Sequence, residues 1–150
     1  MVQYVHTNLI ARDWRKLAQF YIDVFGCTPV LPERDMEGSW IDDMTGLENV
    51  HIKGIHLSLP GYEHGPTLEI FGYNKAEERD DPSINMTGLT HIAFRVDNVP
   101  KYADRVLDHG GSFYGKMIQT YISEVGTLEA VYMKDPEGNI VELQRWINVP

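Results

Sequence analysis

The sequence has one cysteine, few basic residues and no long apolar run. Cys27 alone cannot form an internal disulfide framework, which suits a reducing compartment. The 13 lysines and arginines are outnumbered by 22 acidic residues and form no basic block, which argues against nucleic acid or an anionic membrane as a partner. No window approaches the roughly 18 apolar residues of a membrane span, and residues 1–13 lack the pattern of a secretory signal. We therefore expect a cytoplasmic protein.

The length of 150 residues fits one ordinary domain, or two modules of roughly 70 residues that share a core, because units that small bury little surface alone. Residues 2–11 alternate in polarity and are predicted to form a strand, with His6 on its more polar face. Asp13 is predicted to cap a helix that ends at Gly26, since apolar residues recur between them at helical spacing. This helix is expected to cover one side of a sheet.

The next stretch, residues 28–54, is harder to assign because proline and glycine interrupt a partly acidic sequence. We predict a short strand followed by a long loop, and long loops in compact domains are often functional or mobile. Two further strands are predicted at residues 53–59 and 66–73, on the two sides of a turn. Residues 74–86 are charged and lack apolar periodicity, which is typical of a linker.

After this segment the order of elements repeats. A strand is predicted at residues 88–96, and a helix is predicted from Asp97 or Asn98 to the glycine pair at 110–111. Three more strands are predicted at residues 112–117, 126–134 and 139–146. Each half then contains strand, helix, strand, strand, strand, which makes the fold class α+β. We place an N-terminal module at residues 1–75, a linker at 76–87 and a C-terminal module at 88–150, within one structural domain.

The repeat can be checked by counting residues. His6 and His91 fall in equivalent first strands, 85 residues apart (91 − 6), whereas Glu69 and Glu142 fall in equivalent last strands, 73 apart (142 − 69). The difference of 12 residues indicates an insertion in the first half. We place it in the long loop between residues 32 and 54, which becomes a candidate lid over a site.

Glu142 is the residue of the last strand that needs an explanation. It falls on the same side as Ile140, so strand alternation directs a carboxylate into a partly enclosed surface. An isolated charge in such a place is unfavourable, and a hydrogen-bonded cation, a raised pKa or a metal would relieve the cost.

Two equivalent strands each present a histidine and two each present a glutamate, all on the face opposite the helices. If each half curls its sheet, the four side chains converge. Two imidazoles and two carboxylates suit a divalent transition metal with open positions for water or a small-molecule substrate. Strand alternation predicts a mainly apolar pocket around them, with walls formed by Tyr4, Asn8, Thr67, Phe71, Leu89, Ala93, Arg95, Ile140 and Gln144.

These residues also have simpler interpretations. A single histidine on a strand is more often a hydrogen-bonded structural residue than a ligand, and Glu69 could face solvent at a sheet edge. The paired placement in both halves is what favours a metal site. Arg95 could bind an acidic substrate group or form a surface salt bridge. His56, one strand before Glu69, is the most plausible substitute ligand among four histidines without a counterpart in the repeat, which are His51, His56, His64 and His109.

At these residues the chain resembles the vicinal oxygen chelate superfamily, which includes glyoxalase I, methylmalonyl-CoA epimerase, extradiol dioxygenases and the fosfomycin and bleomycin resistance proteins. The resemblance implies two βαβββ modules that form a cupped, incomplete barrel-like mixed sheet with the helices outside. It also implies one metal, held by His6, Glu69, His91 and Glu142. The motifs that carry it are Val5-His6-Thr7, Asp13, Phe20-Tyr21 to Phe25-Gly26, Thr67-Leu68-Glu69-Ile70, Thr90 to Asp97, and Lys134 to Asn139 continuing into Val141-Glu142-Leu143.

The ligand set is similar to that of glyoxalase I, whereas dioxygenases use two histidines and one glutamate, and the epimerase usually carries an amide at the position of Glu69. A metal that polarises a carbonyl eases removal of the neighbouring proton, and a nearby carboxylate can act as the base. The resemblance therefore implies a lactoylglutathione lyase-like lyase or isomerase that transfers a proton through a metal-bound enediolate or enolate. By that analogy Glu142 is the expected catalytic base, with Glu69 the second candidate.

The resemblance further implies a divalent ion (Ni, Zn, Co, Mn or Fe), a small carbonyl substrate or its thiol adduct, and a homodimer. One departure concerns the substrate. The glyoxalase I pattern carries an arginine shortly after its first histidine, used for the glutathione carboxylate, whereas Leu9 and Ile10 stand there and Arg12 is shifted in register. Glutathione is therefore not assumed. The alternatives are a resistance-type binding protein without catalysis, an epimerase-like enzyme and an iron-dependent extradiol dioxygenase.

Overall fold

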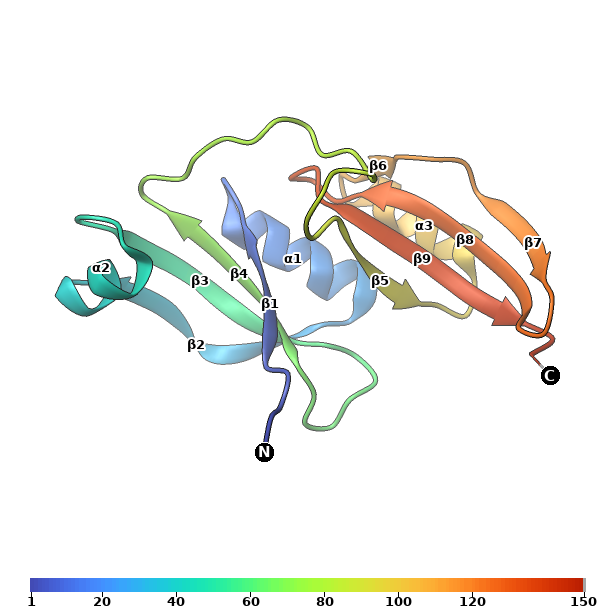
Figure 1. Cartoon of the computed structure of the whole chain (residues 1–150), viewed down its shortest axis with the longest axis horizontal. Helices are drawn as coiled ribbons and strands as arrows, with labels where there is room; N and C mark the ends of the chain where they lie inside the picture. Colours follow the sequence, from blue (N-terminus) through green and yellow to red (C-terminus); the bar gives the residue numbers. More distant parts are fainter. Residues whose placement is uncertain (150) are drawn as a thin grey trace. The chain divides into compact units, whose positions relative to one another are not determined.

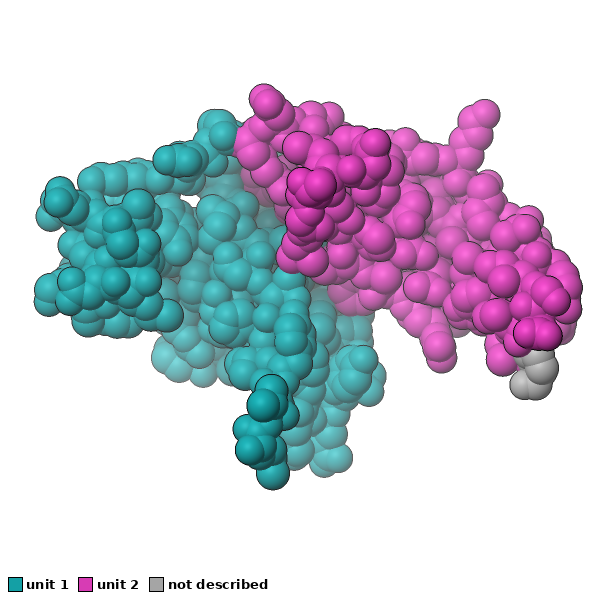
Figure 2. Space-filling model, viewed as in Figure 1, with its two compact units in different colours: residues 1–78 teal, residues 79–150 magenta. Residues whose placement is uncertain are grey.

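The structure is a computed structural model that describes residues 1–149. It forms two compact units, Met1–Glu78 (unit 1) and Arg79–Pro150 (unit 2), shown in Figure 2. No helix in residues 1–149 is long and apolar enough to span a membrane. The elements, labelled in Figure 1, are β1 (His6–Ile10), α1 (Trp14–Phe25), β2 (Thr28–Glu37), α2 (Ser39–Thr45), β3 (His51–Ser58), β4 (Thr67–Tyr73), β5 (His91–Arg95), α3 (Val99–Asp108), β6 (Ser112–Phe113), β7 (Ile118–Ile122), β8 (Gly126–Lys134) and β9 (Ile140–Ile147).

Unit 1 contains a four-stranded mixed sheet in the order β1-β4-β3-β2, in which the β1–β4 pair is parallel and the other two pairs are antiparallel. α1 packs on β3 and β4 (Figure 1), and it forms as predicted. The Asp13 side chain accepts a hydrogen bond from the Lys16 backbone N–H at 3.1 Å, and Gly26 ends the helix in the left-handed region. The apolar side of the helix, including Leu17 and Tyr21, is fully buried, so packing rather than propensity holds it.

The prediction of a long loop in residues 28–54 is wrong. β2 pairs with β3 in two stretches, with a register shift between Val30 and Arg34, and α2 follows it. Ile41 of α2 joins Ile52 of β3 and Phe71 of β4 in a small buried cluster. A helix of seven residues is too short to be stable alone, so this cluster is what holds it. The sequence did not reveal β2 because most of its residues are exposed and two are prolines.

Unit 2 repeats the arrangement with the order β5-β9-β8-β6, and β7 also pairs with β8. β5 and β9 are parallel, and α3 packs on β8 and β9. Asn98, one of the two predicted caps, accepts a hydrogen bond from the Lys101 backbone N–H at 2.9 Å. Of the strand predicted at 112–117, only Ser112–Phe113 is a strand (β6), and β7 begins just beyond the predicted range. All five residues of β7 are exposed, so it lacks the apolar alternation that would have shown it.

The chain is therefore an α+β protein built from two βαβββ modules, as predicted, with α2 added in the first and the edge strand divided in the second. The assignment of residues 1–75 and 88–150 to modules of one domain stays a prediction.

Strand register refines the position of the insertion. Cross-strand pairing makes His56 of β3 the counterpart of Tyr132 of β8, because each pairs with the glutamate of its unit. His6 and His56 are 50 residues apart (56 − 6), and His91 and Tyr132 are 41 apart (132 − 91). Nine of the 12 extra residues therefore precede β3, where α2 lies. The other three lie between β3 and β4, outside the predicted loop.

The turn that leads into β9 is fixed by Asp135, a buried carboxylate that is 3% exposed. Its Oδ1 accepts hydrogen bonds from the backbone N–H groups of Glu137 and Asn139, each at 2.9 Å. Its Oδ2 accepts one from the Asn139 side-chain amide at 2.8 Å. These bonds set the start of the strand that carries Glu142.

Replacing this carboxylate should weaken folding. Asp135→Ala leaves two backbone N–H groups without their acceptor, and we expect a loss of about 1–3 kcal/mol in the free energy of unfolding, measured by urea denaturation. Asp104→Ala, on the exposed side of α3, is the control and should change it by less than about 0.5 kcal/mol. Equal effects of the two substitutions would contradict this account of the turn.

Cys27 is 3% exposed, and burial raises the pKa of its thiol to about 11. At pH 8 only about one thiol in a thousand is then ionised, and the thiolate is the reactive form. We expect almost no reaction of the native protein with an aromatic disulfide reagent, and one equivalent of reaction after unfolding in guanidinium. Rapid reaction of the native protein would show that the thiol is accessible.

Candidate metal centre

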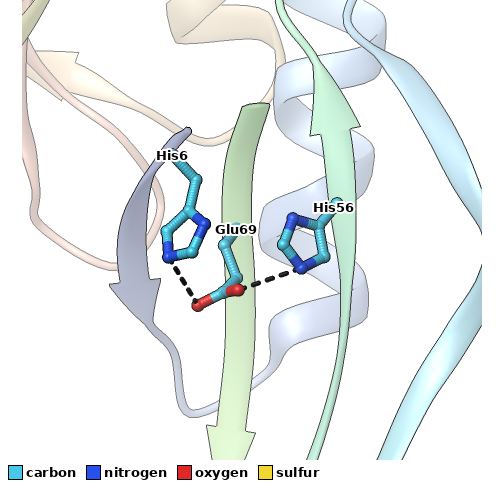
Figure 3. Close-up of side chains that lie close together, drawn as sticks. All are labelled: His6, His56 and Glu69. Carbon is cyan, nitrogen blue, oxygen red and sulfur yellow. Dashed lines mark ion pairs between the residues drawn. The ribbon is translucent and has the colours of Figure 1, made fainter. Parts of the chain in front are cut away.

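Glu69 lies between two histidines on the face of the unit 1 sheet opposite α1 (Figure 3). His6 is on β1, Glu69 on the central β4, and His56 on β3. The distance from His6 Nε2 to Glu69 Oε1 is 3.7 Å, and that from His56 Nε2 to Glu69 Oε2 is 2.9 Å. One ligand atom from each of the three residues lies within 4.8 Å of the other two. We call this group, with Asn8 and Thr67, the N-terminal half-site.

Both oxygens of Glu69 have partners. Asn8 Nδ2 donates a hydrogen bond to Oε1 at 2.7 Å, and the His56 ring contacts Oε2. Asn8, Glu69 and His56 are directly paired across β1, β4 and β3, so they form one row on the sheet. The Glu69 side chain is only 13% exposed. Its carboxylate is therefore held in one orientation by neighbours on both sides.

His56 is also fixed on its other edge. Its Nδ1 lies 3.0 Å from Thr67 Oγ1, and its ring packs edge-on against Phe71, with the centroids 5.8 Å apart. Burial lowers the pKa of His56, and the Glu69 carboxylate opposes that shift. Burial thus favours the neutral imidazole, which is the form that binds metals.

The equivalent C-terminal half-site contains His91 on β5 and Glu142 on β9, with Tyr132 on β8. His91 Nε2 lies 3.3 Å from Glu142 Oε2, and the His91 and Tyr132 rings pack edge-on at 5.1 Å. Burial, reinforced by Glu142, raises the pKa of Tyr132. On the other side of β9, Glu142 pairs with Ala93 of β5, which has no side-chain hydrogen-bond donor. Within residues 1–149, His91 is the only side chain that forms an ion pair with Glu142.

The structure brings the four predicted ligands together as two pairs, His6 with Glu69 and His91 with Glu142. That all four bind one ion stays a prediction. Sequence reasoning underestimated His56, which lies closer to the Glu69 carboxylate than His6 does. It missed Tyr132, because only the first and last strands of the two halves were aligned. Extending the count of the repeat to β3 and β8 would have found both.

Arg12 and Arg95, the two arginines considered for binding an acidic substrate group, have different surroundings. Arg12, the residue shifted from the glyoxalase I pattern, forms a bidentate ion pair with Glu78, with Nε 3.0 Å from Oε1. Arg95 of β5 forms no ion pair with any residue in 1–149. It lines an open groove of about 730 Å³ in unit 2, together with Trp146 and Val125. Its guanidinium is therefore accessible to an anion from solution.

The donors fit a divalent transition metal. Imidazole nitrogen and carboxylate oxygen suit zinc, nickel, iron and manganese. Two such atoms bound to one ion at about 2.1 Å are about 3.0–3.4 Å apart, and the two His–Glu pairs, at 3.7 and 3.3 Å, are close to this spacing. The glutamates also supply negative charge to balance the ion.

Solved structures show the same fold. A glyoxalase family protein from Bacillus cereus matches with a TM-score of 0.84 and 14% identity, over 99% of this chain and 96% of that one. A glyoxalase/bleomycin resistance protein/dioxygenase family enzyme from Burkholderia phytofirmans has a TM-score of 0.63 and 14% identity, over 97% and 100%. The fosfomycin resistance protein FosX from Listeria monocytogenes, in complex with Mn(II) and sulfate, has a TM-score of 0.59 and 15% identity, over 99% and 93%.

A comparison with curated proteins finds no match. The family model described as the Glyoxalase/Bleomycin resistance protein/Dioxygenase superfamily matches residues 3–143, which is nearly the whole chain and includes both half-sites. The chain therefore belongs to the glyoxalase/bleomycin resistance protein/dioxygenase superfamily.

Proposed function

We propose that this protein is a metal-dependent lyase or isomerase of glyoxalase I type, in which His6, Glu69, His91 and Glu142 hold one divalent ion. The observation that carries the proposal is the repeated pair: each unit places one histidine beside one largely buried glutamate at equivalent strand positions. The Mn(II) complex of FosX supports a divalent metal in a protein of this fold. A homodimer in the cytoplasm is part of the same proposal.

When bound, a divalent ion polarises a substrate carbonyl and thereby eases removal of a proton from the neighbouring carbon. The two carboxylates differ in their freedom to act on that proton. Asn8 contacts one oxygen of Glu69 and His56 contacts the other. Glu142, in contrast, forms an ion pair with His91 alone within residues 1–149. Glu142 can therefore turn toward the substrate carbon, accept its proton and return it, while Glu69 keeps its orientation.

Arg95 supports a substrate that carries an acidic group. It lies two residues beyond Ala93 on the face of β5 that also carries His91, and it lines the groove of unit 2 without a protein counter-ion in residues 1–149. Guanidinium groups bind carboxylates and phosphates strongly. Arg12 does not compete for this role because Glu78 occupies it. The substrate is then a small carbonyl compound or its thiol adduct with an anionic group, and glutathione is not required.

Metal content tests the first part of this proposal. We expect about one equivalent of a divalent transition metal per chain in elemental analysis of protein purified without added metal, with removal by a chelator and recovery on reconstitution. Less than about a tenth of an equivalent, with no binding on reconstitution, would rule out the metal site. Tight ligand binding that survives chelation, without turnover, would instead indicate a resistance-type binding protein.

Substitution of Glu142 tests its role as the base. Thiohemiacetals and acyl-CoA compounds with an anionic group are screened for deuterium exchange with solvent, and a productive substrate is then used. We expect Glu142→Gln to lower the exchange rate at least about 100-fold, because the amide cannot accept the proton. Glu69→Gln is the matched variant and should weaken metal affinity more than it lowers exchange at saturating metal. Retained exchange in metal-loaded Glu142→Gln would remove Glu142 from this role.

A further inference from the structure

Unit 1 carries a third potential ligand that the four-residue site leaves out. We propose that His56 binds the metal, and that His6, His56 and Glu69 together hold a divalent ion without His91 or Glu142. This inference rests on the proposed function, because the two sets share His6 and Glu69. It assigns retention of the metal to unit 1 and leaves Glu142 for proton transfer.

The distances are those of a nearly assembled site. Neighbouring ligands on an ion with bonds of about 2.1 Å are about 3.0–3.4 Å apart. The two contacts of Glu69, 2.9 Å to His56 and 3.7 Å to His6, fall on either side of this range. The widest separation within the group is under 4.8 Å. The His6 side chain is the most exposed of the three, at 39%, and a small rotation would complete the site.

The surrounding contacts orient these side chains as ligands. In the metal-free chain Nε2 of His56 donates to the Glu69 carboxylate, and a bound ion would replace that proton. Thr67 Oγ1, 3.0 Å from Nδ1, is then placed to accept the Nδ1–H of the coordinated ring. Asn8 donates to Glu69 and fixes the carboxylate plane. Hydrogen bonds of this kind, to the far side of each ligand, are a regular feature of metal sites.

A purely structural His56–Glu69 hydrogen bond is the competing interpretation, and unit 2 argues against it. Unit 2 builds the same parallel and antiparallel strand pairs without any of these groups. At the positions of His56, Asn8 and Thr67 it has Tyr132, Ala93 and Ile140. The fold therefore does not need the imidazole or its supporting residues. In this protein these polar side chains surround Glu69, and their counterparts around Glu142 are different residues.

The two sets of ligands can be separated with Co(II), which adds hyperfine-shifted, solvent-exchangeable N–H signals to the proton NMR spectrum when histidines coordinate it. Four forms of the full chain are titrated with Co(II). They are the wild type, the double variant His91→Gln/Glu142→Gln, and each of these two with His56→Gln added. Circular dichroism confirms that each variant is folded. His64→Gln is the matched control, since His64 is an exposed histidine of unit 1 outside the half-site.

We expect His91→Gln/Glu142→Gln to keep one equivalent of Co(II) and to show two shifted N–H signals, from His6 and His56. Adding His56→Gln should remove one signal and weaken Co(II) binding at least about 100-fold, more than the loss of a supporting hydrogen bond alone. Thr67→Val should weaken binding about tenfold while both signals remain. His64→Gln should change neither quantity.

Two results would overturn the inference. One is loss of Co(II) binding in His91→Gln/Glu142→Gln while the wild type binds. That result would favour the four-ligand site of the proposed function. The other is an unchanged set of shifted signals when His56 is replaced. Absence of Co(II) binding by the wild type would overturn this inference and the proposed function together.

Discussion

The pairing of β4 between β1 and β3 is the constraint on which the rest of the candidate site depends. Because β4 is central, Glu69 has a neighbour in the same row on both sides, Asn8 and His56, and a carboxylate that would be costly to bury alone is hydrogen-bonded instead. A shift of either register by one residue would turn one neighbour to the opposite face, which packs on α1. The fold and the geometry of the candidate ligands are thus set by the same hydrogen-bond ladder.

The duplicated module has given its two carboxylates different surroundings. Glu142 is buried almost as deeply as Glu69, with 15% against 13% of the side chain exposed, so burial does not distinguish them. The difference lies in the donors: an amide and an imidazole hold Glu69, whereas Glu142 has His91, with Tyr132 beside it. The proposed division of roles, with Glu69 fixed and Glu142 free to carry a proton, rests on this asymmetry.

The helix inserted in the first module, α2, is linked to the sheet face that carries Glu69 and His56. α2 is held by Ile41 in a buried cluster with Ile52 and Phe71, and Phe71 also packs edge-on against the His56 ring. The inserted helix and the imidazole are therefore supported by one aromatic side chain. In unit 2 the connection from β7 to β8, residues 123–125, is a short turn without a helix.

The sequence by itself determined the α+β class, the repeated modules and both capped helices, because periodicity, capping residues and internal repetition are local or countable. The same repetition predicted His6, Glu69, His91 and Glu142 as candidate ligands. The sequence did not determine β2, α2 and β7, whose exposed or proline-interrupted residues carry no periodic signal. Nor did it assign His56 its place beside Glu69. Only the tertiary structure decided that, because the partner of a strand residue depends on register between segments, and register is set by the whole sheet rather than by either segment alone.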